Sequence, residues 1–140
     1  MAKVSTLLCF DFGLSNIGVA VGNTLTKEAR PLAILGAQNG KPNWDKVSAL
    51  VNEWLPNAVI VGNPINEGGE STDLSARAAR FARQLEGRFQ LRVELHDERF
   101  TSKEAKSRAK DAGHGGDYAT APIDDLAAAI ILESYLTSET

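Results

Sequence analysis

The sequence is poor in cysteine and in histidine, and it lacks any long apolar run. Cys9 is the only cysteine, so it has no partner for an intrachain disulfide or for a thiolate zinc site. No stretch approaches the roughly 20 apolar residues that a membrane-spanning helix needs. The first ten residues also lack the layout of a secretory signal peptide. We therefore expect a cytoplasmic protein, reduced and not inserted in a membrane.

The composition is that of one ordinary globular domain. The chain has 140 residues, of which 43% are hydrophobic and 24% are charged. This is enough apolar material for a single core. Because the sequence shows neither an internal repeat nor a linker, we expect one domain over residues 1–140.

The charge is distributed unevenly along the chain. The net charge is −3, which argues against a protein that coats nucleic acid without specificity. The segment 77–110 nevertheless carries ten Lys or Arg against five Asp or Glu, a net charge of +5, and the rest carries −8. Such a run is often only a solvated helix surface. It becomes informative here because it surrounds Glu98.

The hydrophobic periodicity predicts an α/β fold. Short apolar or alternating runs predict strands at 6–11, 17–21, 32–35, 58–61 and 91–95. Helices are predicted from Asn43 to about Pro56, from Leu74 to a terminating Gly87, from the capping box at Thr101, and from about Pro122 to Leu136. The first three strands suit a meander, and the later strands alternate with helices. We therefore predict a five-stranded mixed sheet flanked by helices.

Three carboxylates occur where the backbone would direct them towards one edge of that sheet: Asp11, Glu98 and Asp124. Asp11 ends an apolar strand, where an unpaired charge costs on the order of several kcal/mol unless a cation neutralises it. Glu98 follows the strand 91–95, and Asp124 lies at the start of the last helix. The spacing therefore predicts an acidic site at this edge.

The chemistry of that site follows from its ligands. Hard oxygen ligands from separate elements, without a His or Cys cluster, suit Mg²⁺ or Mn²⁺ rather than zinc. Two such ions about 4 Å apart can activate a water and stabilise the leaving oxygen of a phosphoryl displacement. The predicted substrate is a phosphate ester.

Each of these residues also has a structural explanation. Asp124 and Asp125 would be favoured by the helix dipole in a first turn, and Glu98 could form a surface ion pair with Arg99 or Lys103. Asp11 has no comparable structural purpose.

A family resemblance spans nearly the whole chain. It is carried, in this order, by Phe10-Asp11-Phe12-Gly13, Ile17-Gly18-Val19-Ala20, His96-Asp97-Glu98-Arg99, and Asp124 with Ala127-Ala128 and Ile130-Ile131-Leu132-Glu133-Ser134-Tyr135. These motifs resemble the YqgF (RuvX) family of Holliday-junction-resolvase-like proteins, which are candidate nucleases for the 5′ end of pre-16S rRNA. The family's Gly-Leu-Pro motif reads Gly62-Asn63-Pro64 here.

The resemblance implies a ribonuclease-H-like fold and a metal-dependent nuclease active in ribosome maturation. Its acidic triad falls on Asp11, Glu98 and Asp124, with Asp125 as the alternative to Asp124 should the register differ by one. RNA, and pre-rRNA in particular, is the substrate that the resemblance favours. We expect a monomer or a weak homodimer.

Four cations are candidates for contacts with the nucleic-acid backbone: Arg77, Arg80, Arg99 and Lys103. Phosphate binding needs cations beside the metal ions and carries no sequence information.

Three other functions remain open at this point. Holliday junction DNA is an alternative substrate, and a non-catalytic RNA-binding or transcription-associated factor is an alternative of another class. The segment 10–22 also resembles the first phosphate loop of the actin, sugar-kinase and Hsp70 superfamily, which suggests an ATP-binding protein. Such enzymes hold nucleotide between two domains, whereas 140 residues supply one.

Overall fold

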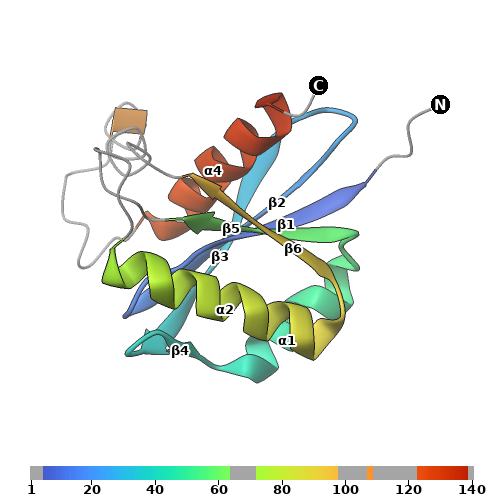
Figure 1. The fold of residues 1–140 in the computed structure, drawn as a ribbon. Helices are drawn as coiled ribbons and strands as arrows, with labels where there is room; N and C mark the ends of the chain where they lie inside the picture. Colours follow the sequence, from blue (N-terminus) through green and yellow to red (C-terminus); the bar gives the residue numbers. More distant parts are fainter. Residues whose placement is uncertain (1–4, 64–71, 98–106, 109–122, 139–140) are drawn as a thin grey trace.

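A six-stranded mixed sheet forms the centre of the molecule (Figure 1). The computed structural model describes residues 5–63, 72–97, 107–108 and 123–138. Its strands are β1 Thr6–Asp11, β2 Asn16–Asn23, β3 Ala29–Gln38, β4 Lys41–Pro42, β5 Ala58–Asn63 and β6 Arg92–Asp97. Its helices are α1 Trp44–Trp54, α2 Asp73–Phe89 and α4 Asp124–Ser138.

The strand order β4-β3-β2-β1-β5-β6 puts the first strand inside the sheet. Strands β1 to β3 form the predicted antiparallel meander, which the short β4 extends, whereas β1, β5 and β6 run parallel to one another. Parallel strands need crossover connections, and the intervening helices supply the cover for a sheet face. This explains why β1 and β5 are continuous apolar runs with side chains buried on both faces.

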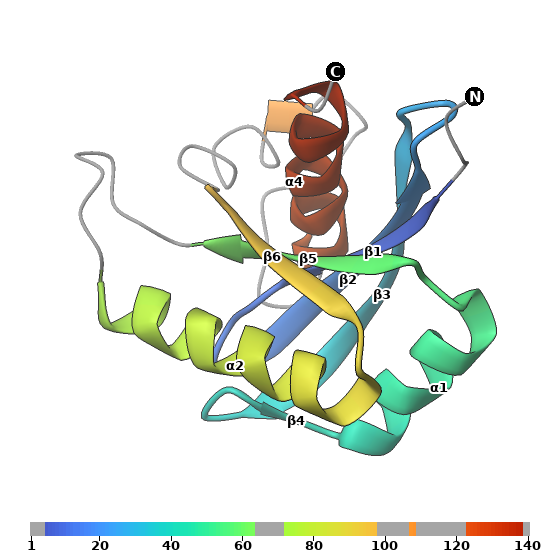
Figure 2. The same ribbon diagram turned by 45° about the vertical axis from the view of Figure 1, so that its right-hand side comes forward.

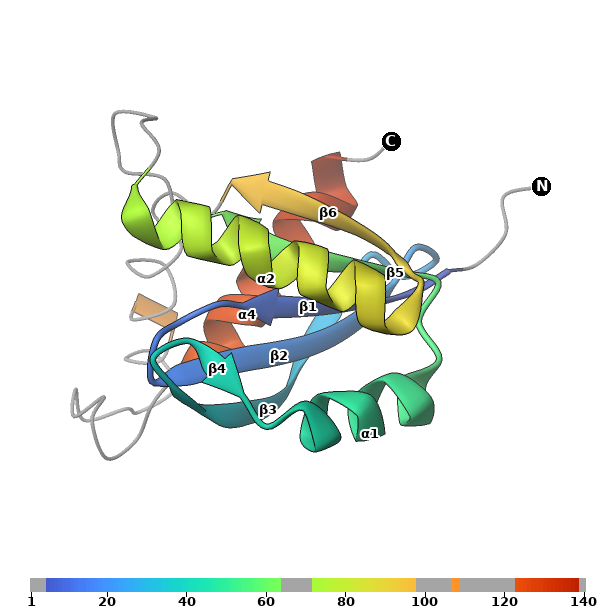
Figure 3. The same cartoon turned by 60° about the horizontal axis from the view of Figure 1, so that its bottom comes forward.

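Helices α1 and α2 cover one face of the sheet, and α4 covers the other (Figures 2 and 3). On the first face, Phe81 of α2 lies at the centre of an aromatic cluster. Its ring centroid is 5.7 Å from Phe10, 5.3 Å from Phe12 and 5.7 Å from Trp44. These rings join β1 to both helices.

On the second face, α4 packs directly against β1, β2 and β5. Ile131 and Leu132 are buried against Cys9 and Ile60, while Ala128 and Ala129 pack on Ala20 of β2. The helix is apolar on nearly all sides, as the sequence predicts for a buried helix.

Side-chain caps begin the two helices of the first face. Asn43 accepts a hydrogen bond from the Asp45 N–H at 2.9 Å, as predicted, and Thr72 accepts one from the Ser75 N–H at 3.1 Å. The helices end at Leu55 and Gln90, both in the left-handed conformation.

The structure corrects two details of the sequence prediction. The sheet has six strands instead of five, because the two-residue β4 pairs with the end of β3. Gly87 does not end α2, which continues to Phe89, a residue packed against the core. The helix predicted from Thr101 lies mostly outside the described residues. Among the described helices, none is long and apolar enough to cross a lipid bilayer.

Candidate functional site

Three parallel strands end at the same edge of the sheet, and each ends in a polar residue. Strand β1 ends at Asp11, β5 at Asn63 and β6 at Asp97. Asn63 pairs with Asp97 in the ladder between β5 and β6. Ligands of open α/β sheets commonly bind beyond the carboxyl ends of such strands. This edge is therefore the candidate site.

Strand alternation puts the Asp11 side chain on the α4 side of the sheet. Leu7 and Cys9 belong to the core cluster under α4, and Leu8 and Phe10 to the cluster under α1 and α2. Because successive side chains of a strand point to opposite faces, Asp11 continues the row of Leu7 and Cys9. Its partly buried carboxylate therefore faces the layer that contains α4.

Gly18 brings Asp124 to the same place. Gly18 is the partner of Asp11 in the antiparallel ladder of β1 and β2. A side chain on Gly18 would overlap the backbone carbonyl group of Asp124, and its Cβ would lie 2.8 Å from the Asp125 nitrogen. The first turn of α4 therefore rests on the backbone beside Asp11. The structure thus brings together two of the three predicted acidic residues, Asp11 and Asp124.

The helical period places Asp124 and Asp125 on neighbouring stripes of α4. Residues 124, 131 and 135 form one stripe of α4, and residues 125, 132 and 136 form the next. Tyr135 contacts β6, whereas Leu132 and Leu136 lie against Gly22 of β2. Both stripes contribute to the core cluster with β1 and β5, and the Asp124 stripe extends to β6 through Tyr135. Asp125 accepts a hydrogen bond from the Leu126 N–H at 2.9 Å.

Burial raises the pKa of the Asp124 carboxyl above its ordinary value of 3.8. The hydrogen bond from its own backbone N–H lowers that pKa, and the neighbouring charge of Asp125 raises it further. A carboxylate that is costly to ionise in the bare protein is stabilised by a cation bound beside it. The two carboxylates and their hard oxygen atoms thus fit a divalent metal ion such as Mg²⁺ or Mn²⁺.

The third acidic residue, Glu98, lies outside the described residues, as do Arg99 and Lys103. Glu98 follows Asp97, the last residue of β6, directly in the sequence. Within the described ranges, no group of three or more His, Cys, Asp or Glu side chains is arranged to hold a metal ion. The complete triad includes Glu98 and is not covered by that observation.

The two predicted phosphate-binding residues of α2 lie at the same edge but on the other face. The Ser75 hydroxyl donates to the Asn63 side-chain oxygen at 2.8 Å, which ties the first turn of α2 to the end of β5. The Arg77 guanidinium donates hydrogen bonds to the Asp73 carboxylate at 3.3 Å and to the Asn39 side-chain oxygen at 3.2 Å. The Arg80 side chain is exposed.

Two features of this edge do not follow from the local sequence signals. The first is the close approach of α4 to β2. The alternation of small residues in β2 predicts a hairpin strand, but it does not by itself say that a helix will pack on that strand. The second is the hydrogen bond between Asn63 and Ser75. It has no local sequence signal, because it joins the end of β5 to the first turn of α2, and these meet only in the folded protein.

Comparison with known proteins assigns the family. A family model described as "RuvX: Holliday junction resolvase" matches residues 5–138. The chain belongs to the RuvX family. The resemblance inferred from the acidic motifs is thereby confirmed.

Relatives at about half identity cover almost the whole chain. A protein of Pseudomonas savastanoi pv. phaseolicola is 50% identical over 137 residues, which are 97% of this chain and 94% of that protein. A protein of Azotobacter vinelandii is 51% identical over 136 residues, covering 97% and 96%. Both bear the name "Putative pre-16S rRNA nuclease".

Solved resolvase structures share the fold. The chain matches Thermus thermophilus RuvC in complex with a Holliday junction with a TM-score of 0.54 and 16% identity, covering 96% of this chain and 94% of that one. The fowlpox virus Holliday junction resolvase gives a TM-score of 0.54 and 17% identity, covering 96% and 99%. The predicted ribonuclease-H-like α/β class is thus confirmed.

We predict that Gly18→Ala destabilises the protein, because the added methyl group must push the backbone of Asp124 away from β2. Overpacking of this kind costs about 1–3 kcal/mol. Urea denaturation measures the loss. The matched control is Gly36→Ala on β3, where an added Cβ meets nothing within 4 Å, and it should stay within about 0.5 kcal/mol of wild type. Equal effects of the two substitutions would contradict the close approach of α4.

We predict that Asp124→Asn stabilises the metal-free protein at neutral pH. Because the folded pKa of Asp124 is raised, the wild type loses stability as the pH rises from below 3.8 through that folded value. The variant lacks this loss, so its advantage in urea midpoint should be present at pH 7 with EDTA and absent at pH 3.5. The control is Asp45→Asn, which removes an exposed carboxylate from the first turn of α1 and should lose a little stability through the helix dipole. A wild type more stable than Asp124→Asn at pH 7 would disprove the assignment.

Proposed function

We propose that this chain is a divalent-metal-dependent nuclease that hydrolyses phosphodiester bonds in the maturation of the 5′ end of pre-16S rRNA. The observation that carries the proposal is the contact between Gly18 and the start of α4, which sets Asp124 beside the end of the strand that carries Asp11. Relatives at about 50% identity, named as nucleases of this RNA, supply the substrate.

The metal ligands in this proposal are Asp11, Asp124 and Glu98. Asp11 and Asp124 belong to rigid elements that are packed together, which keeps the two carboxylates in fixed relation. Glu98 joins them as the residue that follows β6. Two Mg²⁺ or Mn²⁺ ions held there would supply an activated water and a counter-charge for the leaving oxygen.

The roles of the chain's own groups follow from their surroundings. Burial raises the pKa of the Asp124 carboxyl, and a cation bound beside it would lower that pKa again, so occupancy and ionisation would be coupled. The apolar packing of α4 behind the carboxylates limits water on that side, which strengthens their interaction with a cation.

The alternative substrate within the same chemistry is Holliday junction DNA. The description of the family model favours it, whereas the names of the relatives favour RNA. The site residues serve either substrate, because a metal site of this kind acts on the phosphodiester and does not read the base or the sugar.

We further propose that residues 1–140 act as one domain in the cytoplasm, as a monomer or a weak homodimer. A non-catalytic RNA-binding factor is the outcome that the cleavage experiment below would reveal if the proposal fails.

We predict that Arg77 and Arg80 contact backbone phosphates of the bound nucleic acid. For a single strand, the slope of log K against log salt should fall by about 0.7 for each phosphate-binding cation that is removed. The Arg77→Gln/Arg80→Gln variant should therefore bind RNA with a slope shallower by up to about 1.4, measured by fluorescence anisotropy in EDTA. The control Lys27→Gln/Arg92→Gln removes two exposed cations at the opposite edge and should leave the slope unchanged. Equal slopes for the two variants would remove Arg77 and Arg80 from the binding surface.

We predict that the purified protein cuts pre-rRNA leader fragments in Mn²⁺ or Mg²⁺ and not in EDTA. Asp11→Asn should reduce the cleavage rate by at least about 100-fold, because loss of a metal ligand forfeits about 3 kcal/mol or more of transition-state stabilisation. Four-way junction DNA, assayed in parallel, separates the two substrate classes.

The matched control for Asp11→Asn is Asp97→Asn. Asp97 also ends a parallel strand at this edge, but alternation puts it on the face away from α4, because Glu94 and His96 of the same strand contact α4. Cleavage by this control should resemble the wild type. Metal-independent RNA binding without cleavage of either substrate would favour the non-catalytic factor, and equal cleavage by Asp11→Asn would indicate a contaminating nuclease.

A further inference from the structure

Two polar contacts join the edge strand β6 to helix α4. The Tyr135 hydroxyl donates a hydrogen bond to the Glu94 carboxylate. The His96 Nε2 and the Ser134 Oγ are 3.0 Å apart and hydrogen-bonded. The rings of His96 and Tyr135 meet edge to face, with centroids 5.7 Å apart and planes at 89°. We call these four residues the β6–α4 clamp.

The clamp joins α4 and β6 where the described core cluster beneath α4 contains no side chain from β6. On the face of α1 and α2, β6 joins the core through Val93. On the other face, the described members of the core cluster beneath α4 come from β1, β5 and α4 itself, with Ala29 of β3 at its margin, and none comes from β6. Hydrogen bonds depend on distance and angle more steeply than apolar contacts do. The clamp therefore defines how α4 is seated against β6.

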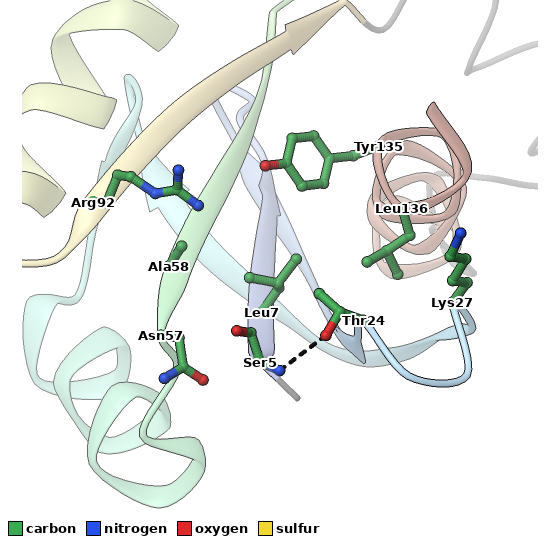
Figure 4. Close-up of a pocket in the computed structure, with 9 residues that line it drawn as sticks. All are labelled: Ser5, Leu7, Thr24, Lys27, Asn57, Ala58, Arg92, Tyr135 and Leu136. Carbon is green, nitrogen blue, oxygen red and sulfur yellow. Dashed lines mark hydrogen bonds between the residues drawn. The ribbon is translucent and has the colours of Figure 1, made fainter. Parts of the chain in front are cut away.

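Tyr135 and Asp124 lie on the same side of α4. They are 11 residues apart, which corresponds to about 20° around the helix axis and about 16 Å along it. Figure 4 shows the Tyr135 side chain extending from α4 over the sheet towards β6. A helix whose Tyr135 is held at β6 therefore has its rotation fixed, and with it the direction in which Asp124 points.

The two ends of α4 are held in different ways. At the first turn, the backbone of Asp124 rests on Gly18, which limits the distance from the sheet but does not by itself fix the helix rotation. Near the last turn, the clamp adds directional hydrogen bonds to the apolar packing of α4. It acts through β6, which is hydrogen-bonded to β5 and through it to β1.

We propose that Glu94, His96, Ser134 and Tyr135 are positioning residues for the metal site, because together they set the rotation of α4 that aims Asp124 at Asp11. The inference rests on the proposed function, since it concerns the same metal site. In this proposal the four residues act through the seating of α4 and are not themselves metal ligands. Partners that orient a metal ligand typically change metal affinity 10- to 100-fold when they are removed.

The test is Tyr135→Phe, which keeps the ring against His96 and deletes only the hydroxyl. Mn²⁺ affinity is measured without nucleic acid, from the electron paramagnetic resonance signal of the free ion. The dissociation constant should rise about 10-fold. The Mn²⁺ concentration that gives half-maximal cleavage should rise in parallel, with the KM for RNA unchanged.

The control for a purely structural effect is Thr137→Val. It deletes another hydroxyl from the end of α4, one that bonds to the backbone carbonyls of Glu133 and Ser134 and not to β6. Urea denaturation of both variants measures any loss of stability. Thr137→Val should keep wild-type Mn²⁺ affinity even where its stability falls.

Conservative replacement provides the rescue. Glu94→Gln keeps an oxygen that accepts from Tyr135 and should bind Mn²⁺ almost as the wild type does, whereas Glu94→Ala should match Tyr135→Phe. The double variant Glu94→Ala/Tyr135→Phe should be no weaker than either single one, because both remove the same hydrogen bond.

Wild-type Mn²⁺ affinity in Tyr135→Phe would overturn the proposed positioning role of the clamp and would leave the proposed nuclease function standing. A loss of affinity that follows stability equally in Tyr135→Phe and Thr137→Val would also overturn it. Absence of Mn²⁺ binding and cleavage in the wild type would overturn the proposed function, and the clamp with it.

Discussion

The close approach of α4 to β2 is the contact on which the rest of the candidate site depends. It is allowed by a row of small residues, Gly18, Ala20 and Gly22, on one side of the strand. The other side of the same strand carries Ile17, Val19 and Val21 and packs into the core under α1 and α2. Strand β2 thus presents large apolar side chains to the face covered by α1 and α2, and almost only its backbone to the face covered by α4. The helix can lie close enough for its first residue to adjoin the ladder position of Asp11.

Chain topology explains why the acidic residues converge at an edge. Because β1, β5 and β6 are parallel, their carboxyl ends meet on one side of the sheet, and strand ends that are far apart in sequence are brought together there. The opposite edge has a different character. It holds a cavity of about 210 Å³. The residues that line this cavity include apolar side chains and the cations Lys27 and Arg92, and there is no carboxylate among them (Figure 4). The direction of the parallel strands therefore places the proposed catalytic carboxylates at one edge of the sheet and this cavity at the other.

Shared fold and shared chemistry do not by themselves assign the substrate. The solved resolvases match over nearly their whole length at 16–17% identity, which supports the fold. Relatives at about 50% identity bear the name of a ribosomal RNA nuclease. A carboxylate site that acts on phosphodiesters is compatible with both. The difference must reside in the surfaces that receive the strand, and we propose that the first turns of α2, with Arg77 and Arg80, belong to them.

Sequence periodicity by itself determined the strands β1 and β5, the helix cap at Asn43 and the burial of α4, because these depend on local alternation and on which side chains avoid water. It also singled out Asp11, since an acid at the end of an apolar strand has no local explanation. It misjudged Gly87, because the tertiary contact of Phe89 outweighs the weak tendency of one glycine to end a helix. Only the tertiary structure decided that the start of α4 lies beside the strand end that carries Asp11. That position depends on the close approach of the Asp124 backbone to Gly18 and on the hydrogen bonds between α4 and β6, contacts between residues that are distant in the chain.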